Sequence, residues 1–206
     1  MRRVLLHLFA MSMGYLTNLP FFKKSVILKK EAVFVTGKMD RFFQVVDDLY
    51  SKFEIPKIYP VPLMAIAKGL GYRVDFFEVT PENEHISGAV YYNEKQIWLN
   101  PGEVAQRRNF TLAHELGHIL LLHDKDVSDG REYDTRKNIT NPEKKDKREV
   151  DANEFAAELL MPEEEFKKVW YKTRSIVELS DFFDVSIAAT NARMEKLGLR
   201  YDYERK

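Results

Sequence analysis

The chain has 206 residues, of which 32 are basic, 32 are acidic and 45% are hydrophobic. This composition suits one globular unit with an ordinary core, and zero net charge argues against binding nucleic acid or acidic membranes through overall charge. Cysteine is absent, which excludes disulfides and cysteine-ligated zinc, so histidines and carboxylates must supply any metal ligands.

Residues 1–38 form an N-terminal extension of uncertain status. Arg2 and Arg3 precede the apolar residues 4–16, which gives the outline of a signal peptide. No small-residue cleavage pattern follows, and the apolar run is too short to span a bilayer comfortably. Met39 is an alternative native start. We expect a cytoplasmic protein that is not inserted in a membrane, with export as the open alternative.

The next segments alternate between helical and extended patterns. Residues 40–53 place apolar side chains at three- and four-residue steps, which predicts an amphipathic helix. A short helix over 63–70 should end at Gly71. Alternation and β-branched or aromatic residues then predict strands over 72–79, 88–92 and 96–99. A sheet edge directly before the next helix could hold an extended peptide by backbone pairing.

A helix-start signature follows the last strand: Asn100, Pro101 and Glu103 have the spacing of a capping box. We therefore expect the next helix to begin there.

This helix contains the sequence His114-Glu115-x-x-His118 within an apolar run. Residues four apart lie on nearly the same helix face, so the two imidazoles can aim at one zinc ion. Glu115 reaches the edge of that site, where it could accept a proton from a metal-bound water. Gly117 costs roughly 1 kcal/mol relative to Ala inside a helix, which indicates the close approach of another backbone.

Residues 124–148 are dense in charge and predict a surface loop, with a lid over a cleft as one reading and a solvated insertion as the other. The second key helix, over 149–161, places Glu149 and Asn153 on the same face as Ala152 and Ala156. Small residues permit close helix contact, so Glu149 is a candidate third ligand.

Two side chains compete with Glu149 for the third position. Asp124 lies six residues after His118, where one class of zinc peptidases places its last ligand, but that pattern requires a glycine where this chain has Leu121. Asp151 is the residual alternative. Glu149 is favoured, and Asn153 is expected to hydrogen-bond a ligating histidine. Glu154 and Glu158 point off the alanine face and are expected in solvent.

The C-terminal residues 163–206 are predicted to be helical. Segments 175–183 and 187–197 flank a tight turn, and Ser186 should cap the second helix. Helix-turn-helix DNA readers share this outline, although two packed helices are far more often purely structural.

Three blocks of the sequence resemble the ImmA/IrrE family of bacterial and phage metallopeptidases. They are Ile97-Trp98-Leu99-Asn100, Arg108 through His118, and Glu149-x-x-Ala152-Asn153-x-Phe155-Ala156-Ala157-Glu158-Leu159-Leu160-Met161-Pro162. The resemblance covers roughly residues 40–200 and includes the C-terminal helices. It implies that His114, His118 and Glu149 hold Zn2+, that Glu115 is the catalytic base, and that the substrate is a helix-turn-helix repressor.

The predicted fold class is α+β, with a small, partly antiparallel three-stranded sheet packed on zincin-like active-site helices. Residues 39–162 form the metallopeptidase domain, and a segment resembling a helix-turn-helix follows. The predicted function is that of a zinc-dependent endopeptidase acting on a regulatory protein of a mobile element or stress response. One alternative is a DNA- or protein-binding regulator with a structural or vestigial zinc site. A hydrolase of small substrates is a weaker alternative.

Overall fold

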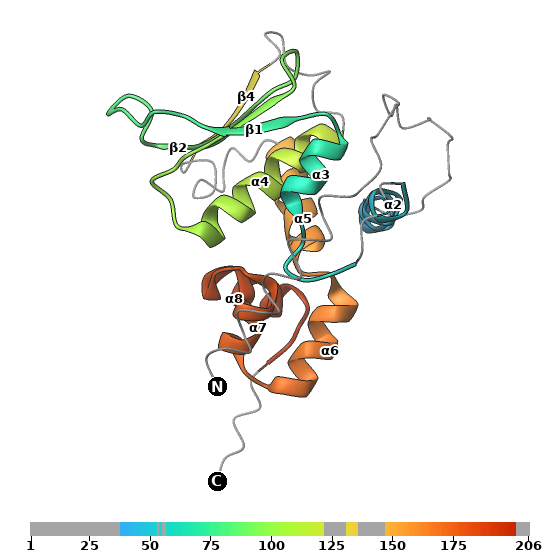
Figure 1. Ribbon diagram of the computed structural model, residues 1–206. Coiled ribbons are helices and arrows are strands. Elements are labelled where there is room, and N and C mark those ends of the chain that lie inside the picture. The colour runs from blue at the N-terminus through green and yellow to red at the C-terminus, as the bar shows by residue number, and fades with distance from the viewer. Residues whose placement is uncertain (1–37, 53, 55–56, 122–130, 136–146, 201–206) are drawn as a thin grey trace, which may run out of the picture. The chain divides into compact units, whose positions relative to one another are not determined.

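The computed structural model of the chain describes residues 38–52, 54, 57–121, 131–135 and 147–200. The helices are α2 (Lys38–Lys52), α3 (Leu63–Gly69), α4 (Ala105–Leu120), α5 (Lys147–Leu160), α6 (Glu163–Thr173), α7 (Ile176–Phe183) and α8 (Ile187–Lys196), and the strands are β1 (Arg73–Phe76), β2 (Ile86–Tyr91), β3 (Gln96–Leu99) and β4 (Arg131–Thr135) (Figure 1). Among these helices none has both the length and the apolar character needed to cross a bilayer.

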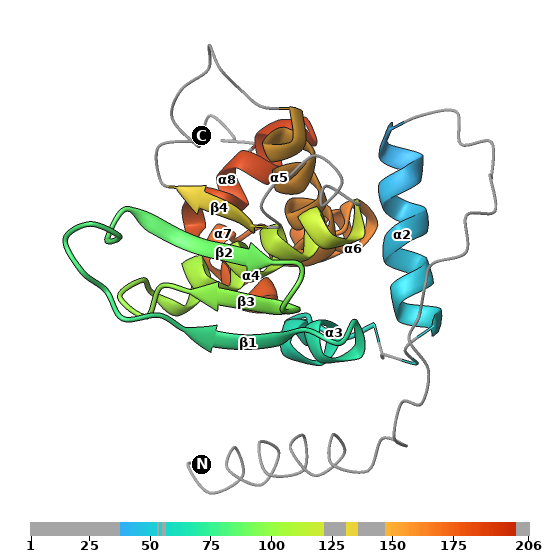
Figure 2. The same cartoon turned by 90° about the horizontal axis from the view of Figure 1, so that it is seen from above.

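The strands form one mixed sheet with the order β1-β3-β2-β4 (Figure 2). β1 pairs with β3 in parallel, whereas β2 pairs antiparallel with both β3 and β4. The predicted α+β class and the partly antiparallel sheet are confirmed. The sheet also has a fourth strand, β4, inside the segment predicted to be a charged loop. Charged residues are common on edge strands, and backbone pairing does not require apolar side chains. Residues 122–130 and 136–146 of that segment lie outside the described residues.

The strand that precedes the motif helix is not an edge of this sheet. β3 lies between β1 and β2 and has a hydrogen-bonded neighbour on each side. The predicted pairing of a substrate with this strand is therefore wrong, because its backbone groups are already used.

The core of the site lies between one face of the sheet and α4. Val90 and Ile97 are fully buried on this face, and α4 contacts both β2 and β3. Alternation along a strand and the 3.6-residue period along a helix place these apolar side chains on facing surfaces. Leu112 and Leu116 supply the buried side of α4.

α4 packs most extensively against α5, and the two helices approach closely at Gly117. A Cβ atom added at Gly117 would lie 3.1 Å from Phe155 Cδ1 and 3.2 Å from both the Cα and the carbonyl oxygen of Ala152. The approach of another backbone that Gly117 predicted is confirmed. This contact sets the distance between the two helices that carry the candidate ligands.

The predicted start of α4 is wrong by several residues. The helix begins at Ala105, and its N-cap, Val104, makes no side-chain capping bond. Asn100 instead stabilises the preceding turn: its Oδ1 accepts from the backbone of Gly102 at 2.8 Å, and its Nδ2 donates to the carbonyl of Ile86. The capping residue was therefore recognised, but it caps a turn between β3 and α4.

The C-terminal helices agree with the sequence pattern. Ser175 accepts a hydrogen bond from Glu178 N at the start of α7, and Ser186 accepts from Ala189 N at the start of α8. α6 contacts α7, and α7 contacts α8. In the N-terminal part of the described chain, α3 ends before Gly71, which has the left-handed φ of 83° that its predicted helix-stop role requires.

Candidate metal centre

The motif of α4 faces the interior of the protein. His114 and His118 are each 1% exposed, and Glu115 is 0% exposed. The two imidazole Nε2 atoms lie 2.9 Å apart, as expected for residues separated by one helical turn on a common face. Two histidines and a carboxylate in a buried environment need partners or a metal ion, because an unsatisfied buried polar group is costly.

Glu149 brings a carboxylate from α5 to the same point. Its Oε2 lies 3.3 Å from His114 Nε2, and its Oε1 lies 3.4 Å from His118 Nε2. The three side chains each offer one ligand atom, and these atoms all lie within 4.8 Å of one another. A tetrahedral zinc ion with bonds of about 2.0–2.1 Å holds its ligand atoms roughly 3.3 Å apart. The donor set and its spacing therefore fit such an ion.

The electrostatics of this cluster favour an ionised carboxylate. Burial by itself would raise the pKa of Glu149, but His114 and His118, when protonated, oppose it through hydrogen bonds to the carboxylate and through their positive charge. The net effect holds the pKa of Glu149 far below its ordinary value of 4.5. An ionised carboxylate is the form that binds a divalent cation.

Asn153 lies one turn after Glu149 and contacts Nδ1 of His114, the ring nitrogen that does not face Glu149. Its Oδ1 is 3.2 Å from His114 Nδ1. In the tautomer in which Nδ1 donates to Asn153, the lone pair is on Nε2, the nitrogen that faces Glu149 and His118. The amide is thus placed to orient the ring for metal binding.

Gly88 of β2 lets the sheet approach Glu115 closely. A Cβ atom at this position would lie 3.2 Å from Glu115 Oε1 and only 2.5 Å from Thr111 Cγ2. Both neighbours are buried on α4, so a larger residue would force β2 away from the helix. Sequence reasoning missed this contact. The available signal was a glycine at the start of a predicted strand, since a glycine in a strand often marks the close approach of another chain segment.

Of the two other candidate ligands, only one lies in the part of the chain that the structure describes. Asp124 lies outside the described residues, and Asp151 does not belong to the group of possible ligands found among those the structure describes. Glu158 was expected in solvent, but it is 1% exposed and forms an ion pair with Arg193 of α8. That expectation was wrong because α8 covers this side of α5. Glu154 is partly exposed and pairs with Lys196 at 3.2 Å.

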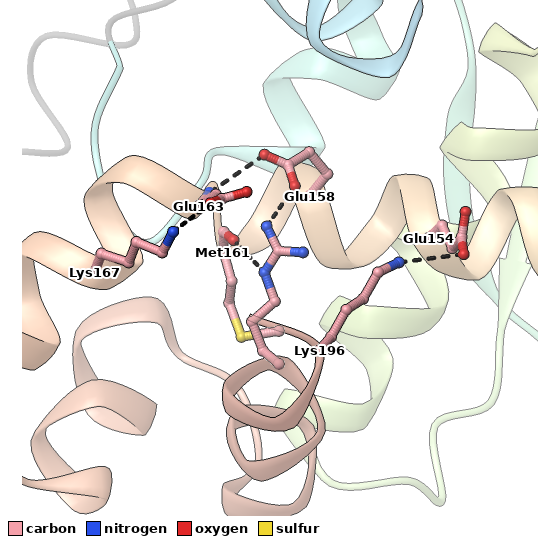
Figure 3. A network of polar contacts seen from close by, with 7 residues as sticks. Glu154, Glu158, Met161, Glu163, Lys167 and Lys196 are labelled. Carbon is pink, nitrogen blue, oxygen red and sulfur yellow. Dashed lines mark hydrogen bonds and ion pairs between the residues drawn. The ribbon is translucent and has the colours of Figure 1, made fainter. Parts of the chain in front are cut away.

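The buried ion pair belongs to a network that joins α5 to the C-terminal helices (Figure 3). Arg193 Nε donates to the carbonyl oxygen of Met161 at 2.9 Å, and its Nη2 donates to Glu158 Oε2. The other oxygen of Glu158 accepts from the backbone of Glu163 at 3.3 Å. Every charged group in this buried network is therefore paired.

A mixed sheet packed on a helix with two histidines, together with a carboxylate from a second helix, defines a metallopeptidase-type fold with a possible His-His-Glu metal site. The model of the IrrE N-terminal-like domain, a peptidase family, matches residues 67–195, and the chain belongs to this family. The resemblance to the ImmA/IrrE family is thereby confirmed.

Among solved structures, the chain is similar to a Mycobacterium tuberculosis transcriptional regulator, with 16% sequence identity and a TM-score of 0.51. The match covers 75% of this chain and 46% of that protein, so the chain corresponds to about half of its length. At this identity the likeness concerns the fold alone. The comparison with curated proteins gave no match.

Proposed function

We propose that the protein is a zinc-dependent endopeptidase that hydrolyses a peptide bond in a regulatory protein. The observation that carries this proposal is the convergence of His114, His118 and Glu149 from two helices, with their ligand atoms within 4.8 Å. Glu115 follows the first of these histidines directly in the chain. A purely structural metal site has no need of such a buried carboxylate.

The protein side chains have distinct roles in the proposed reaction. His114, His118 and Glu149 hold the metal ion, and Asn153 fixes the His114 ring through Nδ1. Zinc, when bound, acidifies water and polarises the scissile carbonyl. Glu115 accepts the proton of the attacking water and returns it to the leaving amine. Its burial between α4 and β2 limits the positions its carboxylate can take.

The proposed substrate is a helix-turn-helix repressor of a mobile element or stress response. This follows from the family to which the chain belongs, since the ImmA/IrrE resemblance implies substrates of that kind. An endopeptidase that removes a repressor acts as a transcriptional switch. The proposed location of the reaction is the cytoplasm, where such repressors bind DNA.

The alternative of a DNA-binding regulator is less compatible with the contacts of α8. A helix that reads DNA needs cations to contact phosphates. Arg193 is buried in its pair with Glu158, and Lys196 pairs with Glu154. Both cations of α8 are therefore used to attach this helix to α5.

Cleavage of purified candidate repressors, beginning with one encoded beside this chain, tests the proposal. The zinc-loaded protein should cut the repressor at one site. Glu115→Gln should bind zinc normally and cleave at least about 100-fold more slowly, the lower range for removal of a general base. Equal cleavage by Glu115→Gln would exclude the assigned base, and failure of the zinc-loaded protein to cut would contradict the peptidase proposal.

A further inference from the structure

A groove of about 550 Å³ lies beside the candidate metal centre, between α4, α5 and α8. Glu149 and Asn153 line one part of it, so the groove is continuous with the site described above. The remaining walls come from the first turns of α4, the outer face of α5 and one face of α8. The groove therefore adjoins the metal centre at Glu149, one of the three candidate ligands.

Part of the lining of this groove is apolar and accessible. Phe110, Val150 and Ala189 are half-buried, and Ala188 and Ala192 are exposed. Ala188 and Ala192 are four residues apart on α8 and face the groove together. Small side chains on this helix leave room that a larger side chain would fill. Accessible apolar surface beside a candidate active site is characteristic of a ligand-binding pocket.

The charged side chains that line the groove are already paired within the protein. Arg107 lies 3.7 Å from Glu103, and Glu149 faces the two histidines. Figure 3 shows the pair of Glu154 with Lys196, and Arg193 pairs with Glu158. A charged substrate group would have to compete with these partners, whereas an apolar group would lose only its contact with water. The groove thus selects for uncharged, apolar ligands.

On the basis of the proposed peptidase function, we infer that this groove binds large apolar side chains of the substrate next to the scissile bond. The groove is then a specificity site, and α8 contributes its wall without taking part in the chemistry. Ala188 and Ala192 set the space available for the substrate side chain. The C-terminal helices are therefore part of substrate recognition, and their attachment to α5 fixes the shape of the groove.

Selection from a random peptide library displayed on phage tests this inference without requiring catalysis. The target is the zinc-loaded Glu115→Gln protein, and the affinities of enriched peptides are measured by fluorescence anisotropy. Enriched peptides should share a large aliphatic or aromatic residue. Ala192→Trp should weaken their binding at least tenfold, since tenfold is about 1.4 kcal/mol and burial of one Leu or Phe side chain contributes more than that. Ala188→Trp should act in the same way.

Asn191→Trp is the matched control, because Asn191 is exposed on the same helix and does not line the groove. It should change affinity less than about twofold. Three results would overturn the inference: no enriched apolar peptides, equal binding by Ala192→Trp, or a dimer of the protein that Ala192→Trp dissociates in sedimentation. Binding without cleavage by the wild-type protein would contradict the peptidase proposal alone. Equal cleavage by the wild-type and Ala192→Trp proteins would contradict the groove inference alone.

Discussion

Substitution of Gly117 by alanine should disturb the protein and the metal centre together. In an exposed helix, this change would stabilise by about 1 kcal/mol, because glycine is a poor helix former. At this position the new Cβ would lie 3.1–3.2 Å from Phe155 Cδ1 and from two backbone atoms of Ala152. The backbone contacts are relieved only if α5 moves. Overpacking of this kind costs about 1–3 kcal/mol.

Because the obstacle is backbone, we expect a cost of about 2–3 kcal/mol, at the upper end of the overpacking range. The gain of about 1 kcal/mol in helix propensity offsets part of this cost. The free energy of unfolding should therefore fall by about 1–2 kcal/mol. For a unit of this size, that corresponds to a fall in Tm of roughly 2–8 °C. Because α5 also carries Glu149, its displacement from α4 should weaken zinc binding. Calorimetry with chelator measures the packing effect alone, and titration with a fluorescent zinc indicator measures the affinity. A Gly117→Ala protein with unchanged zinc affinity and equal or higher Tm would refute the close contact.

Two further perturbations test contacts away from the metal. Arg193→Met should destabilise the protein by about 3–5 kcal/mol in urea unfolding, because it leaves Glu158 charged and buried. Replacement of both residues by Met should cost less, since no buried charge is then left unpaired. A larger loss in the double variant would contradict the ion-pair account. Burial raises the pKa of Tyr50, so the wild-type free energy of unfolding should fall as pH rises above about 10. Tyr50→Phe should reduce this fall, with the remainder due in part to Tyr59, whose pKa burial also raises. No loss is expected at pH 7, since the buried Tyr50 hydroxyl has no hydrogen-bond partner among the described residues. An identical alkaline profile in both proteins would exclude Tyr50 as a cause.

The helices of the site were predictable because their patterns are local. Residues four apart place His114 and His118 on one face, and the small residues of α5 indicated which of its faces approaches another helix. Gly117 even predicted where the two backbones meet. These inferences require only the geometry of a single helix and the steric size of each residue.

The errors concern contacts between segments that are distant in the sequence. Glu158 has the residue type of a solvent-facing position, and only the presence of Arg193 35 residues later makes its burial possible. β4 was missed because it lies in a segment rich in charge, and its pairing with β2 depends on backbone groups that the side-chain pattern does not reveal. The groove between α5 and α8 likewise could not be predicted, since a local sequence pattern does not indicate which helices enclose a space.

The central claim is that one imidazole pair from α4 and one carboxylate from α5 bind a single metal ion. Zinc content after dialysis, measured by mass spectrometry for wild type, Glu149→Ala and Asp124→Ala, tests it most directly. We predict one zinc per chain in the wild type and in Asp124→Ala, and a clear loss in Glu149→Ala. Full zinc retention by Glu149→Ala, with loss in Asp124→Ala, would contradict the claim and assign the third ligand to Asp124.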